Sequence, residues 1–400
     1  MSAVHAGQFA VRYPLVTALA LSFGAAISLG ISRFSYALLL PPMREDLQWS
    51  YLLAGTMNTA NAFGYFVGAL MTPTLMRRLN AQAALIGGAV LTGVFMLLSG
   101  FFTEAVILLL QRVLAGIASA FIFISGGLLA ARLGALHPRH AGFLIGLYYG
   151  GTGFGITLSA LLVPATLEAA GHTAHAWQWA WLVLGGVSLA LTLLMAFPAR
   201  QVDGAATATS GGVQFRVREF AFGLSGYFMF GVGYIGYMTF IIALLKEQGM
   251  QASSITLFYA LLGMAVVASS RIWARMLDHF KGGQALAILN GLLAVATLLP
   301  VLSATPAAVF TSGILFGAVF LSVVASTTAL VRHNLPSEAW SPGISGFTTV
   351  FAFGQIVGPT IVGWISDGAG GLERGLVFSA IALLAGALLA SRQRPLQRRA

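Results

Sequence analysis

Two arginines stand inside apolar stretches of the sequence, where a permanent charge is costly. Arg33 lies in the run GISRFSYALLL, residues 30–40, and Arg112 lies in the run LLLQRVLAG, residues 108–116. A guanidinium stays protonated and binds a carboxylate or a phosphate through two parallel hydrogen bonds. At membrane depth an arginine costs about 2.5–3.5 kcal/mol on insertion scales unless it meets water or a partner. The pair therefore suggests anion binding, provided that the surrounding elements bring the two residues together.

The composition shows which solvent surrounds these stretches. The chain has 400 residues, of which 58% are hydrophobic and 8% are charged, whereas a soluble protein has about 25% charged residues. Apolar runs long enough to cross a hydrocarbon core predict twelve membrane helices, the first of them retained rather than cleaved as a secretory signal. They cover residues 15–40, 51–75, 83–102, 105–131, 142–164, 177–198, 219–245, 253–275, 283–302, 306–332, 342–366 and 373–391.

The basic residues predict the orientation of these helices. Lys and Arg concentrate in alternate segments that include both ends of the chain, and the other loops keep only Arg44, Lys246 and Arg374. Because positive loops stay in the cytoplasm, we expect both termini there, in a multi-pass protein of the plasma (inner) membrane. The net charge of +10 is thus explained by topology, and no nucleic-acid partner is expected.

The chain divides into two similar parts. The small, polar and basic segment 199–218 predicts a cytoplasmic linker between an N-terminal six-helix bundle, residues 1–198, and a C-terminal six-helix bundle, residues 219–400. The first helix carries Gly30, Arg33 and Tyr36, and the seventh carries Gly231, Tyr234 and Tyr237 at the same spacing. Such repeats favour a substrate site near the middle of the membrane and transport by alternating access.

Several motifs resemble those of the major facilitator superfamily. The segment GALMTPTLMRR keeps Gly68, Arg77 and Arg78 of the loop signature, with Thr72 at the position of its acid, and WARMLDHFKGG keeps Asp278. RVLAG, residues 112–116, is similar to the Arg element of helix 4, and RFSYALLLPPMREDLQWS resembles the YbfB/YjiJ-type branch. The resemblance implies the major facilitator fold, in which helices 1 and 4 line the central cavity.

The two arginines should then lie in one layer. Each is about seven residues, or about 10 Å, from the outer end of its helix, and the two helices run in opposite directions. No Asp or Glu falls in the interior of a predicted helix, so the layer is positively charged. We therefore predict that Arg33 and Arg112 clamp an organic anion. The polar residues expected beside them in the substrate site are Tyr36, Asn58, Asn61, Tyr148, Tyr234, Tyr237 and Gln355.

Two structural alternatives compete with the clamp. Arg112 could instead bond to backbone carbonyls of helix 1, and Arg33 could extend to the outer interface, since long basic side chains place their charge in the headgroup region. The buried amides and phenols could be interhelical bonds rather than substrate contacts. On the cytoplasmic side, Gly68, Arg77, Arg78, Arg275 and Asp278 are predicted to act in gating, and retention of positive charge in the cytoplasm is the alternative.

These features predict a secondary carrier for a small solute, acting as a monomer in the lipid bilayer. A proton-coupled drug or sugar efflux carrier with structural arginines is the alternative function. An intramembrane enzyme or a receptor is disfavoured, because the helix interiors lack the acids, cysteines and histidines that such enzymes need. The sequence contains no GxxxxGK[ST] loop and 0 cysteines, so no ATP site, cofactor or metal is expected. The substrate, the direction of transport and the coupling ion stay open.

Overall fold

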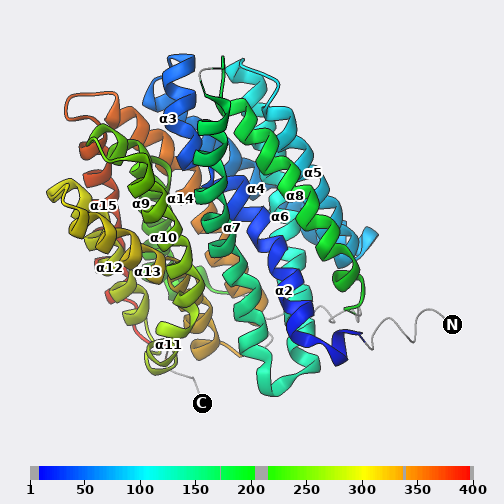
Figure 1. Ribbon diagram of the computed structural model, residues 1–400. Coiled ribbons are helices and arrows are strands. Elements are labelled where there is room, and N and C mark those ends of the chain that lie inside the picture. Colours follow the sequence, from blue (N-terminus) through cyan, green and yellow to red (C-terminus); the bar gives the residue numbers. More distant parts are fainter. Residues whose placement is uncertain (1–8, 172, 203–214, 337–338, 397–400) are drawn as a thin grey trace. The chain divides into compact units, whose positions relative to one another are not determined.

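The protein is all-helical within residues 9–171, 173–202, 215–336 and 339–396, which the computed structural model describes (Figure 1). The chain groups into two compact units, Met1–Trp49 with Ala60–Ala206, and Ser50–Thr59 with Thr207–Ala400. Most of the predicted linker, residues 203–214, lies outside the described residues. Within the described ranges, 11 helices are long and apolar enough to cross a membrane. The predicted second span is a helix of 29 residues that is less apolar.

The first unit contains the helices that correspond to the first six predicted spans. Its first span is one continuous rod, drawn in blue in Figure 1, with the parts α2 (Pro14–Ala25), η1 (Ala26–Phe34) and α3 (Tyr36–Leu47). The others are α4 (Tyr51–Leu79), α5 (Ala81–Ser99), α6 (Ala105–Leu136), α7 (Ala141–Ala170) and α8 (Trp177–Arg200). The short helix η2 (Pro138–His140) joins α6 to α7.

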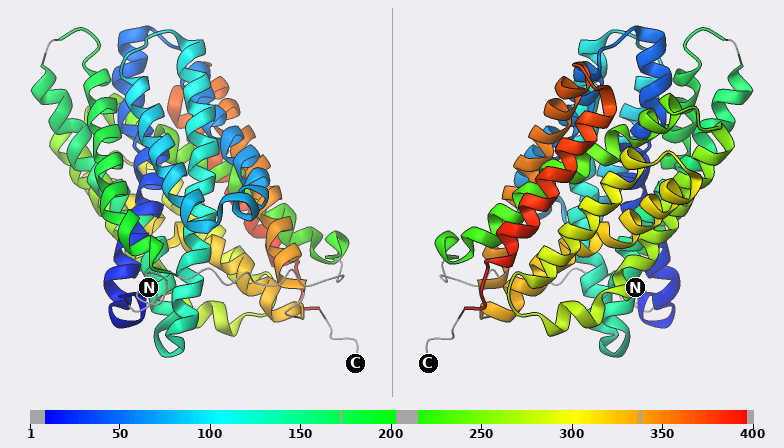
Figure 2. Two further views of the ribbon diagram at one scale, coloured as in Figure 1. Left: turned by 90° about the vertical axis from the view of Figure 1, so that its right-hand side faces the viewer. Right: turned by 90° about the vertical axis from the view of Figure 1, so that its left-hand side faces the viewer.

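The second unit repeats this pattern after the short helix η3 (Val217–Phe220). Its long helices are α9 (Ala221–Glu247), α10 (Ala252–Ile272), α12 (Gln284–Leu302), α13 (Pro306–Asn334), α14 (Trp340–Ser366) and α15 (Gly371–Ser391), and the short α11 (Ala274–His279) follows α10. The helix α15, red in Figure 2, packs along α9 and α12.

The first span extends about two turns beyond its predicted end near Leu40, to Leu47. Pro41 and Pro42 lie inside α3, which ends at Leu47 because Gln48 adopts a left-handed φ of 53°. Proline fixes a helical φ and lacks only the N–H donor, so two prolines near a helix end are poor evidence for its boundary.

Close packing of glycine reveals the same architecture in both units. A Cβ built on Gly30 of η1 would lie 2.6 Å from the Cα of Gly155 on α7. In the second unit, a Cβ on Gly231 of α9 would lie 2.7 Å from the carbonyl oxygen of Phe351 on α14. Small residues allow membrane helices to approach closely. The glycines at matching positions of spans 1 and 7 therefore serve matching helix contacts, with spans 5 and 11.

The start of α4 groups with the second unit because its polar groups find partners there. The carboxylate of Asp367, directly after α14, accepts hydrogen bonds from the backbone N–H of Tyr51 at 2.6 Å and of Leu52 at 2.8 Å. Helix N-termini leave such N–H groups unpaired and favour negative charge. Asn58 donates to the hydroxyl of Thr239 on α9 at 2.7 Å. These bonds account for the assignment of residues 50–59.

Candidate functional site

Arg33 occupies a widened segment of the first span. Residues Ala26–Phe34 form a π-helix, and the N–H of Ser35 correspondingly donates to the carbonyl of Gly30, five residues back, at 3.2 Å. Such segments are rare and occur frequently at functional sites. The side chain of Arg33 is only 2% exposed, so it does not extend to the outer interface.

The guanidinium of Arg33 is largely unpaired. Its Nε and Nη2 are buried and have no hydrogen-bond partner among the described residues, and Arg33 forms no ion pair with any of them. A buried donor without an acceptor is costly, and more so when it is charged. Nε and Nη2 are two of the five fixed N–H donors with which arginine holds a carboxylate in two parallel bonds. The side chain therefore keeps two unused donors of this kind.

Arg112, by contrast, is held by the protein. Its Nη1 donates to the backbone carbonyl of Ser32 at 2.7 Å, and the residue is 3% exposed. The guanidinium carbon lies 5.2 Å from the ring centroid of Tyr36 and 5.6 Å from that of Trp181, within the range of cation–π attraction. The predicted alternative, a bond to the helix 1 backbone, thus describes this residue. Arg33 is close enough for its charge to act on Arg112.

Trp181 is part of this cluster and is not among the site residues predicted from the sequence. It lies one turn into α8, is 1% exposed, and its indole N–H has no partner among the described residues. The hydroxyl of Ser32 is likewise buried and unpartnered. The spacing held a signal, since Trp177 and Trp181 are one helical turn apart on the buried face whereas Trp179 is 53% exposed.

The remaining polar candidates of the first unit bond to backbone. Asn61 on α4 donates to the carbonyl of Arg112 at 3.2 Å. Tyr148 on α7 is fully buried, and its hydroxyl donates to the carbonyl of Phe123 on α6 at 2.9 Å. Both bonds join neighbouring helices, which is the role expected of polar groups in membrane bundles.

Replacing Tyr148 by phenylalanine tests this role. We expect Tyr148→Phe to lower the free energy of unfolding by about 0.5–1.5 kcal/mol, because the carbonyl of Phe123 loses its side-chain donor. Thermal unfolding of the purified protein in detergent measures the change. Tyr149→Phe is the matched control, since the Tyr149 hydroxyl makes no hydrogen bond within the described part of the chain. Equal stability of Tyr148→Phe and wild type would show that the bond is not structural.

The candidates of the second unit lie in an aromatic core. The ring of Tyr234 stacks on Phe230 at 4.7 Å and on Phe320 at 5.2 Å between centroids. Tyr237 stacks on Phe316 at 4.0 Å, and its hydroxyl shares a hydrogen bond with Ser312 at 2.7 Å. The rings of both tyrosines thus pack within their own unit, which also supplies a hydrogen-bond partner for the hydroxyl of Tyr237.

Two amide residues of the second unit differ in their bonding. Gln355 on α14 is 2% exposed, and its Oε1 has no partner among the described residues. Asn58, at the start of α4, instead bonds to Thr239. Gln355 therefore keeps a free acceptor that a solute hydroxyl or amide could use, whereas the amide of Asn58 is engaged.

The charged residues of the predicted gate lie at or near helix ends, whereas Gly68 lies inside α4. Gly68 packs α4 on α6, since a Cβ there would be 2.4 Å from the carbonyl of Ile117. Arg77, Arg78, Arg275 and Asp278 are exposed. No ion pair joins Arg275 to Asp278 among the described residues. Gating by these residues stays a prediction.

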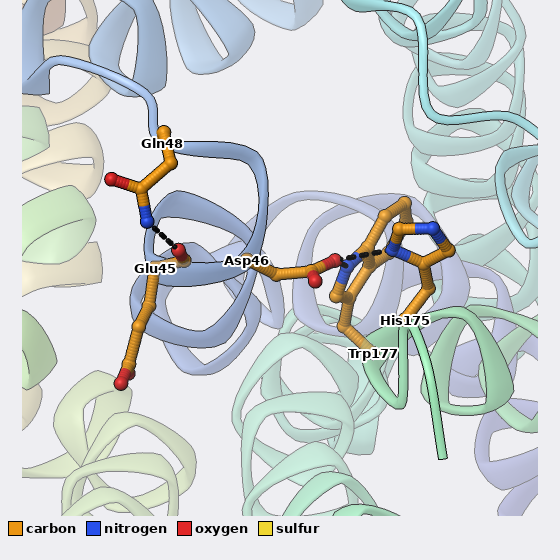
Figure 3. A network of polar contacts seen from close by, with 5 residues as sticks. All are labelled: Glu45, Asp46, Gln48, His175 and Trp177. Atoms are coloured by element: carbon orange, nitrogen blue, oxygen red, sulfur yellow. Dashed lines mark hydrogen bonds and ion pairs between the residues drawn. The ribbon is translucent and has the colours of Figure 1, made fainter.

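An acidic residue ties the end of the first span to α8 (Figure 3). Oδ2 of Asp46 accepts hydrogen bonds from the indole of Trp177 and from Nδ1 of His175, both at 2.6 Å. His175 adopts a left-handed φ of 55°, which is uncommon for a side-chain-bearing residue. These bonds fix the start of α8, and thereby the position of Trp181 one turn further on.

Comparison with solved structures identifies the class of protein. The fold matches a bacterial homologue of the human lysosomal transporter Spinster, with a TM-score of 0.72 at 14% identity, covering 95% of this chain and 96% of the other. It also matches the transporter FucP, with a TM-score of 0.62 at 15% identity, covering 96% and 99%. The chain thus has the major facilitator fold, and the predicted fold class is confirmed.

Comparison of sequences identifies the family. The chain belongs to the family described as "Uncharacterised MFS-type transporter YbfB", which matches residues 25–391. It is 26% identical to the "Chloramphenicol resistance protein" of Streptomyces lividans, over 90% of this chain and 93% of that protein. It is 23% identical to a "Putative tartrate transporter" of Agrobacterium vitis, over 87% and 83%. The protein is therefore a multi-pass membrane transporter that binds small molecules, not an enzyme, as the sequence predicted.

Proposed function

We propose that this protein is a secondary carrier that moves a small organic anion across the inner membrane, with a carboxylate of the solute bound by Arg33. One observation carries the proposal: Arg33 is buried, charged and unpaired at Nε and Nη2. An anion that enters this position supplies two acceptors at once and offsets the charge. Arg112 adds positive charge nearby while it is held by Ser32, so its role is to orient the first span and to attract the anion.

The relatives support an oxygen-rich acid as the solute. One relative is named a tartrate transporter, and tartrate carries two carboxylates and two hydroxyls. A second candidate function is transport of a neutral aromatic drug, which the relative named for chloramphenicol resistance favours. The rings of Phe230, Tyr234 and Phe320 stack on one another, but each is at most 2% exposed, and a neutral drug would leave the free donors of Arg33 unused.

Several finer statements belong to the same proposal. We place both termini in the cytoplasm, because the loops that carry most of the Lys and Arg would then be cytoplasmic. The carrier acts as a monomer by alternating access, with Arg77, Arg78, Arg275 and Asp278 at the cytoplasmic gate. Division at the linker 199–218 leaves each six-helix bundle as one moving part.

A solute panel in proteoliposomes tests the function. We expect saturable uptake of radiolabelled L-tartrate that unlabelled tartrate and succinate inhibit. Succinamide, the uncharged analogue of succinate, should inhibit at least about tenfold more weakly, because its amides lack the negative charge and the paired oxygens that a carboxylate presents to a guanidinium. Saturable flux of chloramphenicol without competition by either acid would contradict the anion proposal and favour the second candidate.

A further inference from the structure

The cluster around Arg33 contains a second unused donor, on α8. Trp181 is 1% exposed, and its indole N–H has no acceptor among the described residues. Indole nitrogen can only donate, and a buried tryptophan usually finds a partner for it. Phenylalanine could fill the same space without burying an unpaired donor. The presence of tryptophan at this position therefore indicates that its N–H binds a ligand.

Contacts through Arg112 link Trp181 to the segment that carries Arg33. The indole ring lies over the guanidinium of Arg112 at 5.6 Å, and Arg112 bonds to the carbonyl of Ser32, the residue before Arg33. Tyr36, one turn beyond Ser32, flanks the same guanidinium at 5.2 Å. Arg112 thus contacts the ring of Trp181 directly and is bonded, at Ser32, to the backbone next to the residue whose guanidinium is unpaired.

The position of Trp181 is fixed independently of any solute. Trp177 lies one turn earlier on α8 and donates to Asp46, at the end of the span that carries Arg33 (Figure 3). This bond sets the height of α8 against the first span. The two donors are therefore held on elements that are fastened to each other, which is the preorganisation that a recognition site needs.

We propose that Trp181 is a specificity-determining residue, whose indole N–H binds a second oxygen of the anion held by Arg33. This inference rests on the proposed function and narrows the substrate class. The solute carries a carboxylate for Arg33 and a further acceptor oxygen, a second carboxylate or a hydroxyl, within reach of a neutral donor. Small dicarboxylates and hydroxy acids fit this requirement, and simple alkyl monocarboxylates do not.

Removal of the N–H alone gives the sharpest test. β-(3-benzothienyl)alanine replaces the indole N–H by sulfur at nearly constant size, and it can be inserted at position 181 by stop-codon suppression. We expect KM for L-tartrate to rise about tenfold, as for loss of one hydrogen bond, with maximal rate and thermal stability preserved. Trp181→Phe should show the same rise. Trp179→Phe, at a residue 53% exposed on the same helix, should leave KM unchanged.

Inhibition by butyrate distinguishes recognition from support of Arg112. Butyrate has the four-carbon chain of succinate but only one carboxylate. Replacing Trp181 by the benzothienyl analogue should therefore weaken inhibition by succinate about tenfold and leave inhibition by butyrate unchanged. An unchanged KM for tartrate, or an equal loss for both acids, would overturn the inference. If wild type carries tartrate and Arg33→Gln does not, either of these outcomes for the Trp181 variants rules out the role of Trp181 but leaves the proposed function intact. If wild type shows no uptake or competition by acids, the proposed function fails with it.

Discussion

Arg33→Gln is expected to abolish tartrate uptake while the protein becomes slightly more stable. Glutamine keeps a polar side chain of moderate length. It removes the positive charge and the two neighbouring donors, Nε and Nη2, that have no protein acceptor. Two hydrogen bonds to a charged group contribute about 3–6 kcal/mol together, which corresponds to a loss of more than about hundredfold in kcat/KM. Removal of an uncompensated buried charge should raise the melting temperature. Uptake in proteoliposomes and thermal unfolding measure the two effects.

Two further variants show whether the charge or its geometry matters. Arg33→Lys keeps the charge and loses the planar fork, so we expect an intermediate loss of uptake. Arg139→Gln removes an exposed arginine of η2 and should leave both uptake and stability unchanged. Wild-type uptake in Arg33→Gln would show that the guanidinium does not hold the solute.

Gly30→Ala is expected to cause a large loss of stability. The added Cβ would lie 2.6 Å from the Cα of Gly155 and 2.6 Å from the carbonyl oxygen of Thr152, both of them backbone atoms of α7. Backbone cannot yield as a flexible side chain does, so the π-helical segment must separate from α7. Overpacking of this kind costs about 1–3 kcal/mol or more. Thermal unfolding in detergent, followed by light scattering, measures the loss.

Gly87→Ala on α5 is the matched control. A Cβ at Gly87 meets nothing within 4 Å, so alanine should stabilise the helix by about 0.5–1 kcal/mol. The two changes are chemically identical and have opposite expected signs. Equal melting temperatures for the two variants would show that the close approach of the first span to α7 does not exist.

Most of the fold could be predicted from the sequence, because hydropathy and charge in loops are local properties of the chain. The positions of the long helices agree with the predicted spans to within a few residues at most ends. The first span was predicted to end near Leu40 but continues through Pro41 and Pro42 to Leu47. The repeated spacing of Gly30 and Gly231 corresponded to matching helix contacts, since a glycine on an apolar face has few other uses.

The sequence by itself indicated that two arginines, and no Asp or Glu, fall in the interiors of the predicted membrane helices. The tertiary structure decided which of them is free. Arg112 bonds to Ser32 and packs against Tyr36 and Trp181, whereas Nε and Nη2 of Arg33 stay unpaired. It likewise made the indole of Trp181 part of the site. Whether a segment enters the membrane follows from its local hydropathy, but the pairing of a donor depends on atoms that only folding brings within about 3 Å.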